Sequence, residues 1–235
     1  MKIWIQSCFT ALAFAYQAGG QSVSDPARIE VYITPYYNSD GPVIEVGGFS
    51  KGLAAKNEPE FVETILKMKQ SWGELRFPEM YVAAIRLYDL GFRNESTYWF
   101  YSAQYRGRLC DQEKIGSIGV PAFELVQTAN AFQQLAGPYI NGYAFGDLDR
   151  LVQIVERVQK ENKTVPDLEK LYPGLTFKRR LEWNSANDSL NQGLAKFLSM
   201  LKDQKTSLKK TRIENGTEAK FSKLTNKEFP SGPIR

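Results

Sequence analysis

Two groups of carboxylates are the residues of this chain best placed for acid–base chemistry. Glu58, Glu60 and Glu63 share one short segment, and Asp147 and Asp149 are two positions apart. A hydrolase that uses paired carboxylates needs two acids facing each other across a cleft. These acids fall instead at predicted helix starts, where the helix dipole favours negative charge. The two aspartates also lack the further oxygen ligands and the glycine of a calcium loop. We therefore predict no catalytic residue, no metal and no cofactor.

The composition narrows the chemistry further. The 235 residues are 43% hydrophobic and 13% aromatic, which is enough for one folded domain, but they include no histidine. Serine–histidine and cysteine–histidine nucleophiles and histidine-ligated zinc are thereby excluded. An enzyme that works through carboxylates or tyrosine remains the minor alternative. Nucleic-acid binding is not expected at a net charge of +4.

The first twenty residues predict a secretory signal peptide. Met1-Lys2 is a short positive start, a mostly apolar stretch follows, and Ala18-Gly19-Gly20 supplies small residues for cleavage. Cleavage after residue 20 would leave Cys110 as the single cysteine, so no disulfide could form within the chain. We expect an exported protein of the bacterial periplasm without stable membrane insertion.

The rest of the chain predicts a mainly α fold with a short N-terminal β-hairpin. Residues 21–56 form the hairpin segment, with strands at 29–33 and 43–46 around an Asp40-Gly41 turn. Residues 57–214 form the helical domain, in which 120–162 could be a diverged helical pair. Residues 215–235 are polar and predict a flexible tail.

The C-terminal end is basic. Residues 196–235 hold 10 lysines and arginines against 4 acids. This end could contact an acidic partner or anionic lipid, or it could be a solvated tail. The scarcity of aromatic residues among its basic residues favours the solvated tail.

Residues 78–107 contain the most specific pattern. Two short helices meet at Gly91, and the second, running to Gly107 with Asn94 as its cap, is apolar on nearly every side, so it must be covered on every side. The segment resembles a Sel-like repeat, a relative of the tetratricopeptide repeat. The matching residues are Leu87-Tyr88, Gly91, Trp99-Phe100, Ala103 and Gly107. The resemblance implies a domain built on a helical hairpin.

An exported chain with such a segment resembles the periplasmic immunity proteins of type VI secretion, and is most similar to those that neutralise phospholipase-type effectors. The resemblance implies a toxin inhibitor that is not an enzyme and whose partner is a lipase-type protein; it leaves the oligomeric state open. The alternative is a Sel-like-repeat scaffold that organises envelope complexes without inhibiting an enzyme.

Aromatic and arginine side chains dominate protein interfaces, so they are the candidate contacts. We expect Trp99, Phe100 and Ala103 to be buried. The predicted partner-binding residues are Tyr36, Tyr37 and Asp40 on the hairpin loop and Tyr101, Tyr105, Arg106 and Arg108 along 78–107.

Overall fold

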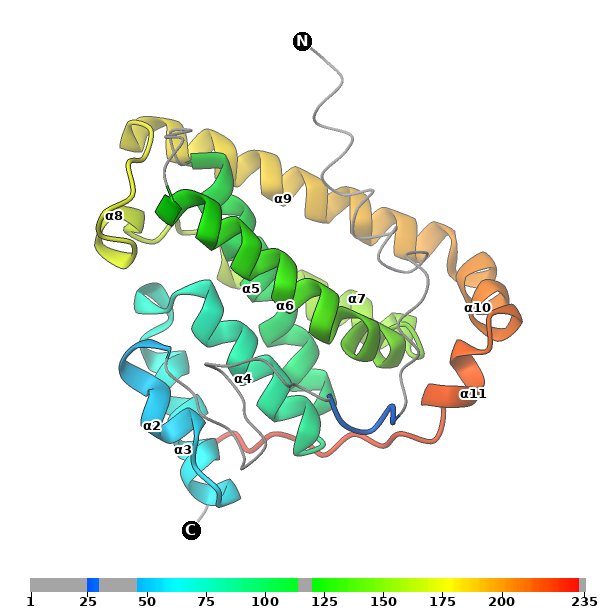
Figure 1. Cartoon of the computed structure of the whole chain (residues 1–235). Helices are drawn as coiled ribbons and strands as arrows, with labels where there is room; N and C mark the ends of the chain where they lie inside the picture. The colour runs from blue at the N-terminus through cyan, green and yellow to red at the C-terminus, as the bar shows by residue number, and fades with distance from the viewer. Residues whose placement is uncertain (1–24, 30–45, 114–119, 233–235) are drawn as a thin grey trace.

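The computed structural model describes residues 25–29, 46–113 and 120–232, and these residues are mainly helical (Figure 1). The longer helices are α3 (Glu58–Gln70), α4 (Phe77–Asp89), α5 (Arg93–Glu113), α6 (Val120–Ala144), α7 (Leu148–Glu161), α9 (Arg180–Asp203) and α10 (Lys205–Glu214). The short ones are α2 (Ser50–Leu53), α8 (Leu168–Leu171), α11 (Thr217–Phe221) and two 3₁₀ turns, η1 (Gly47–Phe49) and η2 (Trp72–Glu74). The mainly α class is confirmed. The predicted signal peptide and nearly all of the predicted β-hairpin lie outside the described residues, and no described residue is in a strand.

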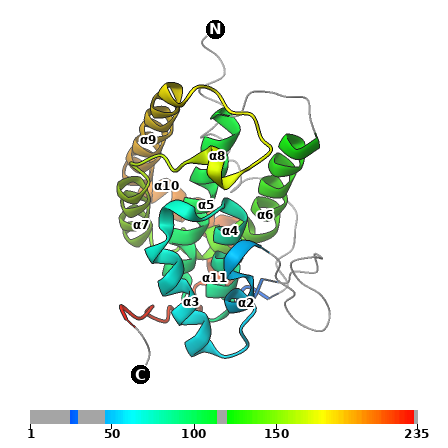
Figure 2. The same ribbon diagram turned by 90° about the vertical axis from the view of Figure 1, so that its left-hand side faces the viewer.

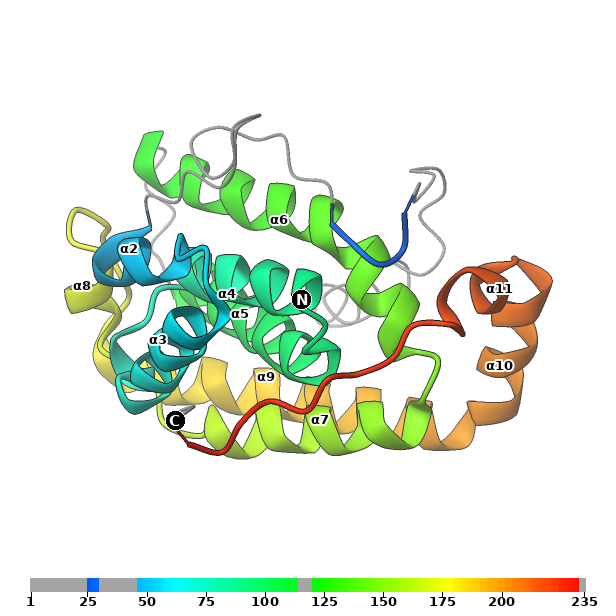
Figure 3. The same ribbon diagram turned by 90° about the horizontal axis from the view of Figure 1, so that it is seen from below.

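Helix α5 occupies the middle of the molecule. It packs against α4, and α6 lies on one side of this pair while α7 and α9 lie on the other (Figures 2 and 3). Tyr98, Trp99, Phe100 and Ala103 are each at most 1% exposed, because neighbouring helices cover this part of α5 on every side. Since α6 and α7 lie on opposite sides of α5, residues 120–162 do not repeat the α4–α5 hairpin.

The turn between α4 and α5 follows from its glycine. Gly91 has φ +87°, a left-handed conformation that glycine adopts at little cost, and the N–H of Phe92 donates to the Leu87 carbonyl at 2.9 Å. Helix α5 begins at Arg93, so Asn94 lies in its first turn and is not its cap. The helix also continues through Gly107 to Glu113, with Gly107 lying close to the Phe77 ring.

The C-terminal residues pack against the helices in place of the expected flexible tail. After α11, residues 222–232, here called the C-terminal strap, cross the α4–α5 turn and reach α3 (Figure 3). The Lys227 N–H donates to the Gly91 carbonyl at 2.8 Å, and Phe229 packs edge-on against Phe92 with 5.4 Å between ring centroids. Polar composition was misleading here because the strap binds mainly through hydrogen bonds.

Asn226 supplies the missing cap of α5. Its Oδ1 accepts the backbone N–H of Asn94 at 2.9 Å, which satisfies a donor that the helix itself cannot pair. Phe92, which precedes the helix, has no side-chain oxygen for this role. The start of α5 therefore depends on a residue at the far end of the sequence.

Arg93 ties the two ends of the described chain together. Its guanidinium donates to the Ala27 carbonyl at 3.2 Å and to the Thr225 carbonyl, and its side chain is buried. The N-terminal segment is also held by α4: the Tyr88 hydroxyl donates to the Pro26 carbonyl at 2.7 Å, and Asp89 accepts the Ile29 N–H at 2.8 Å. Both ends thus meet at one turn.

Replacing Asn226 with alanine should destabilise the protein by about 1 kcal/mol, because the first turn of α5 loses its cap. Urea denaturation would measure the change. Asn184, an exposed residue inside α9, provides the control, since Asn184→Ala should cause no loss of stability. Equal unfolding midpoints for wild type and Asn226→Ala would contradict the capping role.

Asp89 should make the stability depend on pH. Burial raises its pKa to about 6 from the ordinary 3.8, although the Ile29 N–H and Arg28 oppose the shift. The folded state therefore holds this proton more tightly than the unfolded chain. The resulting stabilisation is complete below pH 3.8 and is lost as the pH rises through about 6.

Asp89→Asn should remove this dependence, because the amide stays neutral and its oxygen can still accept the Ile29 N–H. Relative to wild type, the variant should gain on the order of 1–2 kcal/mol between about pH 4 and pH 7.5. Urea midpoints across that range test this, and parallel pH profiles for the two proteins would refute it.

Candidate partner-binding groove

Three residues predicted to contact a partner are buried in the core. Tyr101, Tyr105 and Arg106 are 3%, 4% and 3% exposed. The Tyr101 hydroxyl donates to Asn141 Oδ1 at 3.0 Å, and the Tyr105 hydroxyl donates to Asn187 Oδ1 at 2.7 Å. These side chains have no surface to offer a partner, and their prediction as interface residues is corrected.

The buried arginine has a structural role. Arg106 Nη1 donates to the carbonyls of Trp72 and Leu75 at 3.0 and 2.7 Å, closing the η2 turn over α5. Burial lowers the pKa of Arg106. Of the remaining predicted contacts, Arg108 is half-buried, while Tyr36, Tyr37 and Asp40 lie outside the described residues.

A surface groove lies between α5, α7 and the C-terminal strap. It consists of two adjoining hollows of about 330 and 220 Å³. Both hollows are lined by Asn94 from α5, Arg150 and Ile154 from α7, and Asn226 from the strap. The wider hollow extends towards α10 and α11, and the narrower one extends along α7 towards Phe229. The groove therefore begins where the strap caps α5.

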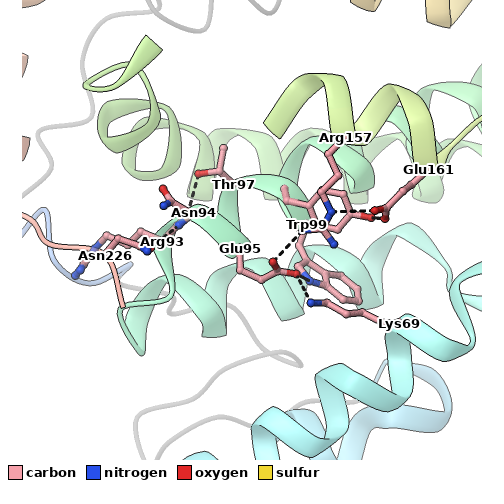
Figure 4. A network of polar contacts seen from close by, with 10 residues as sticks. Lys69, Arg93, Asn94, Glu95, Thr97, Trp99, Arg157, Glu161 and Asn226 are labelled. Atoms are coloured by element: carbon pink, nitrogen blue, oxygen red, sulfur yellow. Dashed lines mark hydrogen bonds and ion pairs between the residues drawn. The ribbon is translucent and has the colours of Figure 1, made fainter. Parts of the chain in front are cut away.

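Glu95 organises the floor of the narrower hollow (Figure 4). Its Oε1 lies 2.8 Å from Lys69 Nζ and accepts the indole N–H of Trp99 at 3.0 Å. Its Oε2 accepts from Arg157 Nη1 at 3.0 Å. One carboxylate thus joins α3, α5 and α7.

Arg157 extends this network along α7. Its Nε donates to Glu161 at 2.9 Å, and its guanidinium lies 3.6 Å from the centre of the Tyr98 ring. Burial lowers the pKa of Arg157, but Glu95 and Glu161 outweigh burial and the net shift is upward. Burial, together with the bond from its hydroxyl to Glu161, raises the pKa of Tyr98. The network holds the wall of the groove in place.

Arg150 differs from the other cations of the groove. Lys227 pairs with Glu58 at 2.5 Å, and the buried Arg212 pairs with Glu218. Arg150 is exposed and donates only to the Gln153 side chain, at 3.0 Å; within the described ranges it has no carboxylate partner. At the junction of the two hollows, the groove thus presents an arginine able to bind a carboxylate in two-point geometry.

The carboxylates singled out in the sequence do not face one another across this groove. Glu60 bonds Asn57 at the start of α3, Glu63 pairs with Lys67 at 2.7 Å, and Asp149 pairs with Lys205. Asp147 caps α7 by accepting the Arg150 N–H at 3.0 Å. In the part of the chain that the structure describes, no three acidic or cysteine side chains are grouped as metal ligands. None of the described helices has both the length and the apolarity that crossing a bilayer requires.

Sequence reasoning missed Arg150, Arg157 and Asn226. The two arginines do stand at positions of α7 separated by seven residues, which places them on one face of a helix. This spacing was a usable signal. Asn226 offered no such signal, because the residues next to it in the sequence do not indicate a contact with α5.

Comparison with known proteins leaves the family open. No family model matches the chain, and no solved structure matches it. A Haemophilus influenzae protein, described only as an uncharacterized protein, is 27% identical over 209 residues, which cover 82% of this chain and 78% of the relative.

Glu95→Gln should destabilise the protein by about 1–2 kcal/mol, because Lys69 and Arg157 would lose their shared carboxylate in a partly buried setting. Glu63→Gln is the matched control, since it breaks an exposed pair with Lys67 and should cost less than about 0.5 kcal/mol. Urea denaturation measures both. Similar losses for the two variants would show that the Glu95 network contributes no more than a surface pair.

Proposed function

We propose that this protein is a periplasmic immunity protein that binds a phospholipase-type toxin, occludes it and so protects the producing cell. The observation that carries the proposal is the groove between α5, α7 and the C-terminal strap, where Arg150 has no carboxylate partner among the described residues. The hairpin also supports the Sel-like resemblance, since Gly91 makes the turn and Trp99, Phe100 and Ala103 are its buried packing residues.

The proposed interface differs from the one expected from the sequence. The aromatic side chains of α5 serve the core, so the partner would bind the exposed surface of α7 and the C-terminal strap. Arg150 would pair with a carboxylate of the toxin, and the Gln153 and Asn94 amides beside it offer further donors.

The network beneath the groove favours tight binding. Lys69, Glu95, Arg157 and Glu161 fix the walls before a partner arrives. A surface that is already ordered loses little conformational entropy on binding, so more of the contact energy remains as affinity.

The test is co-purification from the cell envelope, followed by survival of cells that express the toxin found. Wild type should retain one lipase-like partner, inhibit it and protect the cells. Arg150→Glu should weaken binding by about 100-fold, because a buried carboxylate of the partner would meet a like charge.

Lys196→Glu is the control, because it makes the same change of charge at an exposed position of α9 outside the groove. It should bind as wild type. Unchanged affinity for Arg150→Glu would refute this interface. Recovery of several envelope proteins without a lipase would refute the immunity function and favour the scaffold alternative.

A further inference from the structure

Helices α10 and α11 project from one end of the molecule, beyond the ends of α7 and α9 (Figures 1 and 3). Residues 205–223, which form this corner, include six lysines and arginines against two glutamates. The corner is well ordered by packing: Phe221 is buried, its ring lies against Gly142, and Arg212 donates to the Gly142 carbonyl. The positive charge of residues 205–223 is therefore carried by folded helices and not by a loose tail.

Ile213 stands exposed at this corner. It is 66% exposed, one of two large apolar side chains that the described part of the chain leaves open to solvent. Lys209 and Lys210 precede it by four and three residues on α10, so they share its face of the helix. An apolar side chain thus stands directly beside two lysines.

Several lysines of the corner make no ion pair with a described residue. Lys205 pairs with Asp149 at 2.6 Å, and Lys210 lies 3.7 Å from Glu214. Lys209, Lys220 and Lys223 are exposed and make no ion pair with any described residue, although Lys209 contributes after Lys205 to lowering the pKa of Asp149. We define Lys209, Lys210, Ile213, Lys220 and Lys223 as the basic corner.

The second exposed apolar side chain lies in a different electrostatic setting. Leu181, at the start of α9, is 72% exposed and also follows basic residues. Arg179 pairs with Glu182 at 3.0 Å, and Arg180 pairs with Asp167 and Glu169 at 2.9 and 2.7 Å. Acidic neighbours thus neutralise the arginines beside Leu181, whereas Lys209, four residues before Ile213, makes no ion pair with any described residue.

We propose that the basic corner binds the surface of an anionic phospholipid bilayer. Lysine ammonium groups are attracted to the negative surface and their long stems reach the phosphates, while an apolar side chain enters the boundary between headgroups and acyl chains. A projecting convex corner meets a flat bilayer without a clash. An acidic protein partner would use the lysines, but it would not account for Ile213, which is 66% exposed beside them.

Membrane contact here would place the groove beside the bilayer. Arg212, Glu218 and Phe221, which anchor the corner, also line the wider hollow of the groove. A phospholipase acts at the membrane surface. A protein held there by this corner would therefore be at the same surface as such a partner. This inference goes beyond toxin binding and does not depend on it, because vesicles alone test it.

The experiment is co-sedimentation with lipid vesicles, using the protein expressed as the full chain so that the cell processes any export signal. Vesicles of phosphatidylcholine with about one-third phosphatidylglycerol should bind it, and pure phosphatidylcholine vesicles should bind it at least about tenfold more weakly. High salt should release the protein, since the attraction is screened.

Two variants separate the charge from the apolar contact. Lys209→Glu/Lys210→Glu should lower the partition coefficient on anionic vesicles about tenfold or more, and Ile213→Asp should lower it several-fold. Leu181→Asp is the matched control and should bind as wild type. Circular dichroism checks that each variant is folded, and Lys220→Glu/Lys223→Glu replaces the first pair if it is not.

Three results would overturn the proposal. The first is equal binding of wild type to the two kinds of vesicle. The second is an equal loss of binding to anionic vesicles for Ile213→Asp and Leu181→Asp. The third is that wild type binds polyglutamate but no vesicle. The last result would show that the corner binds acidic protein surfaces.

Discussion

Residues 96–106 of helix α5 are all buried, and this constraint fixes the positions of the other helices. Aromatic residues follow one another along α5, so α4, α6, α7 and α9 are needed to bury them. Close-packed interiors leave little freedom in how such helices are placed. The groove is a by-product of this arrangement, since α7 and the C-terminal strap approach α5 at its first turns and leave the hollows between them.

Polar interactions then secure what apolar burial brings together. At the start of α5, Arg93 holds both chain ends, and two residues later Glu95 joins three helices. Arg93 bonds the Ala27 and Thr225 carbonyls, and Glu95 contacts Lys69 and Arg157, so both side chains join segments that are distant in sequence. Hydrophobic burial is roughly proportional to area and sets no register, whereas these bonds are directional and fix how the elements meet.

The sequence predicted the helical class, the turn at Gly91 and the burial of Trp99, Phe100 and Ala103, because each depends on local periodicity or on one residue's conformational freedom. Three of its predicted partner contacts were wrong, because those side chains are buried. Tyr101, Tyr105 and Arg106 have the residue types of a binding surface, but core aromatics with hydrogen-bonded hydroxyls have the same types, and only the surrounding helices distinguish the two. The packing of the C-terminal strap against the helices was not predicted for a related reason. Hydrogen bonds to backbone groups that are distant in sequence leave no pattern in a polar segment.

The cap that Asn226 places on α5 spans 132 residues of sequence. A chain that leaves the ribosome N-terminus first has the whole of α5 available long before the residue that completes it. During synthesis, the first turn of the central helix therefore stays without this cap until residue 226 has been added, and contacts of such long sequence separation form slowly. A polypeptide that stops before residue 226 therefore carries α5 and the helices packed around it, but lacks the side chain that caps the central helix.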